Sequence, residues 1–216
     1  MTSRDAILQR IRNELSGADK PAPPPPTEVW PTTDPTPEAM AERFTAELEK
    51  VAGEVVRCKS IDDAQAKLAE LMQTSEWQSL GAVDRPICRE LTADLPAEQV
   101  EWAKADWDPQ EMGRLSAGLV AAEWLLADTG SAVVVNETPE QRLLCYLPPA
   151  CVVVARSDQL REHMPAAWPE IARSTSDPDR RGEFVVITGP SRTADIEKIL
   201  ILGVHGPKRL VVLLIE

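Results

Sequence analysis

Residues 183–207 read Glu-Phe-Val-Val-Ile-Thr-Gly-Pro-Ser-Arg-Thr-Ala-Asp-Ile-Glu-Lys-Ile-Leu-Ile-Leu-Gly-Val-His-Gly-Pro, and this stretch decides the fold class. Phe184–Ile187 is a continuous apolar run of the kind found in buried strands. A Gly-Pro turn follows at Gly189, and apolar residues then recur at helical spacing until Gly203. The stretch therefore predicts a buried strand, a turn, and a helix over residues 191–202.

Three further runs have the same character: Ala132–Val135, Cys151–Ala155 and Leu210–Ile215. Strands that are apolar at every position are buried on both faces, as in a largely parallel sheet that is covered by helices. Helical patterns lie between several of these runs, near residues 113–125, 157–172 and 191–202. Strands that alternate with helices indicate a layered α/β domain.

The N-terminal part of the chain divides into three segments. Residues 1–19 form a helical arm, with helical spacing over residues 3–15. Residues 20–37 are rich in proline, which favours an extended spacer; a ligand for a proline-recognition module is the alternative. Residues 38–216 form the α/β domain. Within its first part we expect helices at 37–51 and after Ile61, and strands at 54–57, 80–83 and 86–89.

Charge and composition exclude several classes of partner. The formal net charge of −12 argues against nucleic acid and against an anionic membrane surface, because both need clustered basic residues. The sequence has no run long and apolar enough for a transmembrane helix, and its first residues contain no apolar segment, so we expect no secretory leader. The four cysteines are scattered, and the two histidines have no metal-ligand spacing. These features predict a cytoplasmic protein with reduced thiols and no metal.

Two polar turns are the candidate ligand sites. Free N–H groups at the start of the predicted 191–202 helix would attract a carboxylate or phosphate, and Arg192 would add a bidentate contact; a plainly capped helix is the alternative. The second turn precedes the strand at Ala132. Together the turns supply the candidate anion-binding residues, which are Gly189, Ser191, Arg192, Thr193, Asp195, Asp128, Thr129 and Gly130.

Histidine is a natural acid–base group, so His205 is a weaker candidate of the same kind. Because the predicted helix crosses the sheet, His205 should lie at the opposite edge from Gly189, where a turn-stabilising role is favoured. His163 is expected to be solvated. No catalytic residue is assigned, and neither a P-loop nor a dinucleotide fingerprint is present.

Three segments together resemble the motifs of a known family. Residues 188–197 with 202–207, residues 127–131 and residues 142–149 are similar, in the expected order, to motifs of the LUD-domain lactate-utilisation protein C (LutC/YkgG) family. The similarity covers residues 113–216. Asp128 stands where the family motif has a glutamate, which keeps the carboxylate.

The resemblance implies a three-layer α/β/α fold with a largely parallel sheet, like the NagB/RpiA/CoA-transferase group. It also implies a component of a system that oxidises L-lactate to pyruvate. The iron–sulfur clusters would belong to partner proteins, with no cofactor in this chain, and this chain would bind a small carboxylate or a partner. A stand-alone CoA-ester or folate-type enzyme and a non-catalytic assembly or regulatory subunit are the alternatives.

Overall fold

The computed structural model describes residues 3–16, 30, 33–176, 183–194, 200–202 and 205–216. The chain forms two units, Met1–Pro31 and Thr32–Glu216. The first unit contains the predicted helix, α1 (Ser3–Ser16), whose Ile7 and Ile11 side chains are exposed. Most of the predicted proline-rich linker lies outside the described residues.

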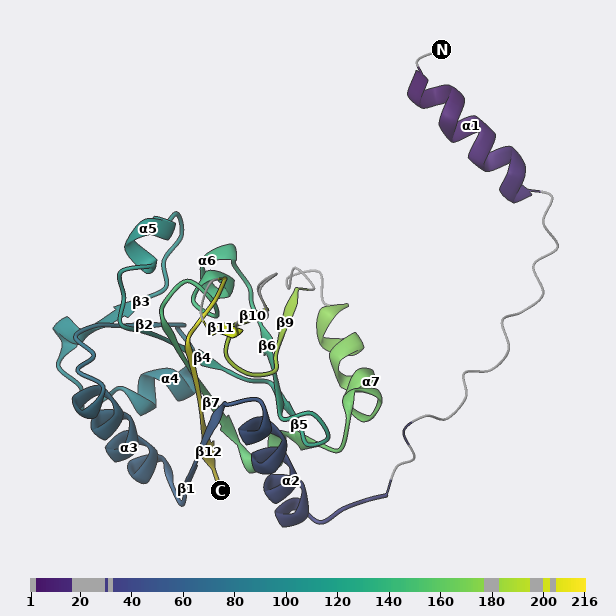
Figure 1. Cartoon of the computed structure of the whole chain (residues 1–216). Helices are drawn as coiled ribbons and strands as arrows, with labels where there is room; N and C mark the ends of the chain where they lie inside the picture. The colour runs from purple at the N-terminus through teal and green to yellow at the C-terminus, as the bar shows by residue number, and fades with distance from the viewer. Residues whose placement is uncertain (1–2, 17–29, 31–32, 177–182, 195–199, 203–204) are drawn as a thin grey trace. The chain divides into compact units, whose positions relative to one another are not determined.

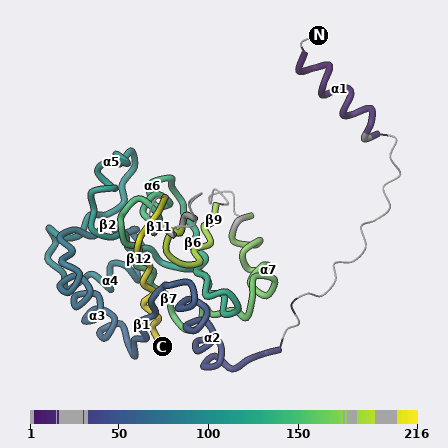
Figure 2. Tube along the Cα trace, viewed as in Figure 1, coloured from purple at the N-terminus to yellow at the C-terminus, as the bar shows by residue number. Residues whose placement is uncertain are grey.

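A six-stranded parallel sheet forms the centre of the second unit (Figure 1). The C-terminal strand β12 runs between β1 and β7 (Figure 2). The largely parallel sheet predicted from the apolar runs is therefore confirmed. In spatial order the strands are β1 (Glu54–Cys58), β12 (Arg209–Ile215), β7 (Ala150–Arg156), β4 (Ala117–Ala121), β2 (Leu80–Ala82) and β3 (Val100–Trp102).

Helices flank this sheet on both faces. The connections from β1 to β2 and from β2 to β3 run toward the β3 edge of the sheet, and they contain α3 (Ile61–Thr74) and α4 (Pro86–Leu91). The connections from β3 to β4 and from β4 to β7 run back toward the β1 edge, and they contain α5 (Pro109–Met112) and α6 (Pro139–Leu143). Because crossovers between parallel strands are right-handed, the two helix pairs lie on opposite faces. The members of each pair contact each other.

The helices predicted at residues 37–51 and after Ile61 are confirmed, and their ends follow from capping. The Thr36 hydroxyl accepts a hydrogen bond from the Ala39 N–H at the start of α2 (Pro37–Lys50), which also has proline at its first position. The Ser60 hydroxyl accepts one from the Asp63 N–H at the start of α3. Both helices bury one apolar stripe, which includes Phe44 and Leu48 in α2.

A second sheet of four strands packs beside the first, in the order β8 (Leu160–Arg161), β5 (Trp124–Leu126), β6 (Ser131–Val135) and β9 (Phe184–Ile187). The pairs β5–β6 and β6–β9 are antiparallel. The prediction that the runs at 132–135 and 184–187 join the parallel sheet is therefore wrong. The interior strand β6 is apolar because both of its faces are covered, not because its neighbours run parallel to it.

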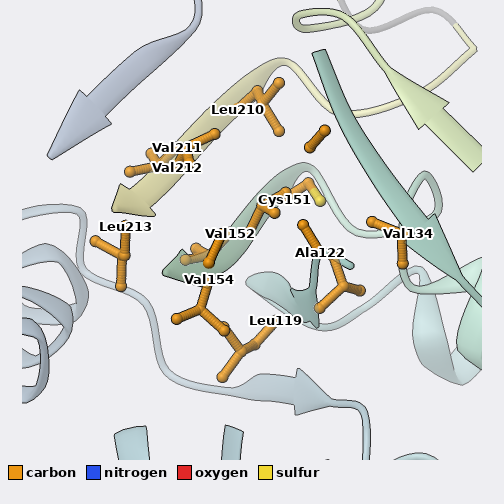
Figure 3. Close-up of a cluster of buried hydrophobic side chains, with 14 of the residues drawn as sticks. Leu119, Ala122, Val134, Cys151, Val152, Val154, Leu210, Val211, Val212 and Leu213 are labelled. Atoms are coloured by element: carbon orange, nitrogen blue, oxygen red, sulfur yellow. The ribbon is translucent and has the colours of Figure 1, made fainter. Parts of the chain in front are cut away.

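The two faces of the second sheet have different neighbours. Val134 points toward Cys151 and Ala122, on the side of the central sheet (Figure 3). The alternate residues Trp124 and Val133 pack against Ile171 of α7 (Met164–Thr175), which lies beside β5. Side chains of a strand point alternately to its two faces, so a continuous apolar run is what this sandwiched position requires.

Other local predictions fail for identifiable reasons. The helix predicted near 113–125 is replaced by β4 and β5, because their apolar residues are buried in sheets on every side. The strand predicted at 86–89 is α4, in which Pro86 takes a first-turn position. The helix predicted at 157–172 is preceded by the 3-10 turn η2 (Ser157–Gln159) and begins only at Met164. A similar turn, η1 (Ala97–Gln99), precedes β3.

The helix predicted over residues 191–202 is also wrong. Arg192–Ala194 is the strand β10, which pairs antiparallel with β11 (Leu200–Leu202). The segment contains threonine, isoleucine and leucine at positions that fit either period, and β-branched residues favour strands. Among the helices that the structure describes, none is long and apolar enough to cross a membrane.

Candidate functional site at the converging motif turns

The two polar turns predicted from the sequence lie side by side. Ser131 follows the Asp128 turn at the start of β6, and Thr188 follows the end of β9 on the neighbouring strand. The Ser131 hydroxyl lies 2.8 Å from the Thr188 hydroxyl, and 2.8 Å from the Thr129 hydroxyl on its other side. A chain of three hydroxyl groups therefore joins the 127–131 turn to the Gly189 turn.

Both turns need glycine because they pack against the C-terminal end of α2. Gly130 has a φ of +62°, and a Cβ there would lie 2.3 Å from the backbone nitrogen of Leu48. Gly189 has a φ of +115°, and a Cβ there would lie 3.0 Å from Cγ2 of Val51. The C-terminal end of a helix carries partial negative charge, so this contact offers no attraction for an anion.

Asp128 lies at the rim of the same turn, next to β8. Its N–H donates to the Glu162 carbonyl at 3.0 Å, while its Oδ1 is buried without a hydrogen-bond partner among the described residues. The neighbouring His163 is buried, and its Nδ1 accepts from the Ala166 N–H at the start of α7. The prediction that His163 is solvated is therefore wrong, because the imidazole serves as the N-cap of α7.

A third turn, which carries His205, meets the Gly189 turn. The Ser191 N–H donates to the Pro207 carbonyl at 2.8 Å, and a Cβ on Gly206 would lie 3.1 Å from Cβ of Ser191. The prediction that His205 lies at the opposite edge of the sheet from Gly189 is wrong. The β10–β11 pair returns the chain to its starting point, whereas the predicted helix would have carried it across the sheet.

The His205 turn and the end of the 142–149 motif enclose a pocket of about 440 Å³. The pocket lies at the N-terminal ends of β7 and β12, where the Lys208 N–H donates to the Pro149 carbonyl at 2.8 Å. Its lining residues include a lysine and a histidine, and none of them carries a carboxylate. The lining residues are Gly113, Tyr146, Leu147, Pro149, His205, Gly206 and Lys208. We call this the Tyr146–Lys208 pocket.

A further cation stands next to this lining. Interaction with the Tyr146 side chain raises the pKa of Arg142, and the nearby Glu183 carboxylate raises it further. Arg142 also forms an ion pair with Glu183. Arg142 therefore lies beside Tyr146, and Lys208 and His205 line the same pocket as Tyr146, on a protein whose net charge is −12. The Arg142 charge is offset by Glu183, whereas Lys208 belongs to a lining that holds no carboxylate, which suits a small anion.

The structure places the predicted site residues unequally around the pocket. Gly189 and Ser191 adjoin the turns that form its wall, and the 127–130 turn lies behind them through Ser131. Arg192 is exposed on β10, without the helix start that motivated its assignment. The Thr193 side chain and all of Asp195 lie outside the described residues. The sequence analysis did not predict Tyr146 and Lys208 as site residues, although Tyr146 lies within the 142–149 motif and Lys208 directly follows the 202–207 motif.

The four cysteines are buried. Burial raises the pKa of Cys58 to about 11 and those of Cys88 and Cys145 to about 12. It also raises the pKa of Cys151. The thiols therefore stay protonated and unreactive at neutral pH, as predicted for Cys145 and Cys151. In the described part of the chain no three His, Cys, Asp or Glu side chains are arranged to hold a metal ion.

The LUD domain family model matches residues 41–215, which include the whole central sheet and all three turns. The chain belongs to the LUD domain family. The prediction of this family from its motifs is therefore confirmed, and the pocket described above is formed by the LUD domain itself.

Several LUD relatives align with this chain. Protein YkgG of Escherichia coli is 26% identical over 174 residues, which are 80% of this chain and 72% of that protein. Lactate utilization protein C of Halalkalibacterium halodurans is 31% identical over 134 residues, or 58% of this chain and little more than half, 56%, of that protein. The Exiguobacterium protein of the same name is 26% identical over 233 residues, or 100% and 97%.

A solved structure supports the fold. The crystal structure of a DUF162 family protein from Deinococcus radiodurans superposes with a TM-score of 0.57 and 16% sequence identity. The superposition covers 84% of this chain and 99% of that one. At this level of identity the likeness concerns the fold alone, and it agrees with a parallel central sheet flanked by helices.

Proposed function

We propose that this chain is a component of an L-lactate utilisation system and that it binds a small 2-hydroxy or 2-oxo carboxylate in the Tyr146–Lys208 pocket. The observation that carries the proposal is the convergence of the motif turns on a pocket with basic groups and no lining carboxylate. The end-to-end alignment with lactate utilization protein C of Exiguobacterium supports the choice of system.

The lining groups suit such a ligand. The Lys208 ammonium is a compact point charge that pairs with a carboxylate. The Tyr146 hydroxyl and the His205 imidazole each donate or accept a hydrogen bond, so they serve a 2-hydroxyl and a 2-oxo group alike. Gly206 leaves room because it contributes no side chain to the lining.

The oxidation itself would need partner proteins. Converting a 2-hydroxy acid into a 2-oxo acid removes two electrons and two protons, and we propose that iron–sulfur subunits of the system accept the electrons. The Cys145 and Cys151 thiols of this chain are poor candidates for accepting the electrons, because burial keeps them protonated. In this proposal the chain holds the carboxylate substrate or product.

Calorimetric titration tests the binding site. L-lactate, pyruvate and acetate are titrated into the wild-type chain and into Lys208→Met, Tyr146→Phe and Arg192→Ala. We expect lactate or pyruvate to bind, and at least tenfold weaker binding in Lys208→Met. Lys59→Met is the matched control, because Lys59 is exposed at the carboxyl end of β1, far from this pocket in the sheet.

Two results would contradict the proposal. Equal affinities in Lys208→Met and the wild type would show that the ligand does not bind in this pocket. A loss of affinity confined to Arg192→Ala would place the binding site at β10. Membership of the system is tested separately, by co-purification of this chain with iron–sulfur proteins from the cells that produce it. Turnover of an acyl-CoA by the purified chain alone would instead favour a stand-alone enzyme.

A further inference from the structure

The carboxyl edge of the central sheet has a second pocket, opposite the edge that carries the Tyr146–Lys208 pocket. Successive connections run from β2 toward β3 on one side and from β4 toward β7 on the other. The point between β2 and β4 is therefore a topological switch point, where the connections leave on opposite faces of the sheet. In open α/β sheets such a crevice outside the carboxyl ends of the strands is the usual ligand-binding position.

A pocket of about 350 Å³ occupies this place. Ala121 and Ala122 at the end of β4 and Ile87 of α4 contribute apolar surface to it. Its volume and mixed lining are those of a small-molecule site. The charged residues that line it are Arg85, Arg156, Glu123 and Asp158.

The two arginines of this pocket are held less tightly than others in the described chain. Arg85 lies 3.5 Å from the Glu123 carboxylate and 3.4 Å from that of Glu137, and Arg156 lies 3.7 Å from Glu90. The ion pairs of Arg57 with Glu38, Arg161 with Glu170 and Arg209 with Glu54 close to 2.8, 2.7 and 2.6 Å. The guanidinium groups of Arg85 and Arg156 therefore retain donors for a further anion.

The backbone around these arginines is nevertheless well fixed. The Gln159 side chain accepts from the Arg156 N–H at 2.6 Å and donates to the Ala122 carbonyl at 2.7 Å. On the other wall the Arg85 N–H donates to the Val83 carbonyl at 2.9 Å. Loosely paired side chains on a rigid frame are suited to ligand binding, because little ordering of the backbone remains to be done.

We propose that this Arg85–Arg156 pocket binds a small hydroxylated organic anion. Its carboxylate or phosphate group pairs with the guanidinium groups of Arg85 and Arg156. Its hydroxyls donate to the carboxylates of Glu123 and Asp158, which would repel an anion that offers no donors. The site is separate from the Tyr146–Lys208 pocket and does not depend on the function proposed for it.

Calorimetric titration with four probes tests this ligand class. Glycerol 3-phosphate and D-gluconate carry hydroxyls with a phosphate or a carboxylate, whereas inorganic phosphate and glycerol each carry one feature alone. We expect glycerol 3-phosphate or gluconate to bind at least tenfold more tightly than inorganic phosphate and glycerol. Whichever of the first two binds identifies the anionic group that the site prefers.

Three full-length variants locate the site. Arg85→Gln and Arg156→Gln should each weaken binding at least tenfold; Arg156 is nearly half exposed, so its variant should fold even if Arg85→Gln is destabilised. Arg89→Gln is the matched control, because Arg89 of α4 pairs with Asp84 and stacks on Trp102 outside the pocket. Its affinity should equal that of the wild type, as should that of Lys208→Met.

Other outcomes overturn the proposal. Failure of all four probes to bind the wild type would refute the proposed binding site. Unchanged affinity in Arg156→Gln would show that the ligand binds elsewhere. Inorganic phosphate binding as tightly as glycerol 3-phosphate would leave a simple oxyanion site and refute the role of Glu123 and Asp158. Loss of binding in Lys208→Met but not in Arg156→Gln would assign the ligand to the other pocket.

Discussion

The hydroxyl oxygens of Ser131 and Thr188 lie 2.8 Å apart and link the two polar turns of the LUD domain. Ser131 is almost fully buried, and its oxygen also contacts the Thr129 hydroxyl. The first turn begins β6 and the second follows β9, so this contact closes the end of an antiparallel strand pair. It also sets the position from which residues 189–191 approach the His205 turn.

Replacing Ser131 with alanine should destabilise the protein. The substitution removes the buried Ser131 hydroxyl and leaves the exposed Thr188 and Thr129 hydroxyls without this partner. Water can reach those two groups, so we expect a loss of about 0.5–1.5 kcal/mol of unfolding free energy per hydrogen bond. Chemical denaturation measures the change. Thr129→Ala is the control, since Thr129 is exposed and should cost less than Ser131→Ala; equal losses in the two variants would argue against the buried link.

Gly130→Ala should be more damaging. The positive φ disfavours alanine, and its Cβ would lie 2.3 Å from the Leu48 nitrogen, so α2 or the turn must move. We expect a loss of more than about 2 kcal/mol, measured by denaturation. Gly113→Ala is the matched control, because the nearest atom to its Cβ would be 3.5 Å away. A native-like stability of Gly130→Ala would refute the close packing of this turn on α2.

The Glu162 carboxylate should make stability depend on pH. Hydrogen bonds from the Thr33 side chain and then its N–H lower the pKa of Glu162, and His163 and Arg43 add smaller favourable effects. A carboxyl group whose folded-state pKa lies below its unfolded value of 4.5 stabilises the fold above that pH. This stabilisation is lost as the pH falls from 4.5 through the lowered pKa.

Thermal denaturation of wild type and Glu162→Gln between pH 7 and pH 3 tests this linkage. The difference in melting temperature should be constant near neutral pH and shrink below pH 4.5. The corresponding difference for Glu49→Gln, an exposed residue of α2, should be small throughout. A Glu162→Gln difference that does not narrow in acid would show that the carboxylate charge contributes nothing.

The sequence was informative wherever local chemistry decides the structure. The apolar pattern of the sequence correctly predicted α2 and α3, and the structure shows that hydroxyl caps at Thr36 and Ser60 begin them. The runs in β7 and β12 correctly predicted strands of a parallel sheet. The motif segments identified the LUD family, because their residue types are tied to turns such as Gly130 and Gly189 that accept few alternatives.

Strand partners and the location of the pockets were decided by tertiary structure. An apolar run at β6 reports that both faces are buried, but burial is the same whether the neighbouring strand runs parallel or antiparallel. Residues 192–202 fit a helix or a strand, and only pairing of Thr193 with Ile201 distinguishes them. That pairing returns the chain to Ser191, and so brings His205, Tyr146 and Lys208 around one pocket. Such contacts join residues that are far apart in the chain, so no local sequence pattern predicts them. The packing of the two sheets determines them.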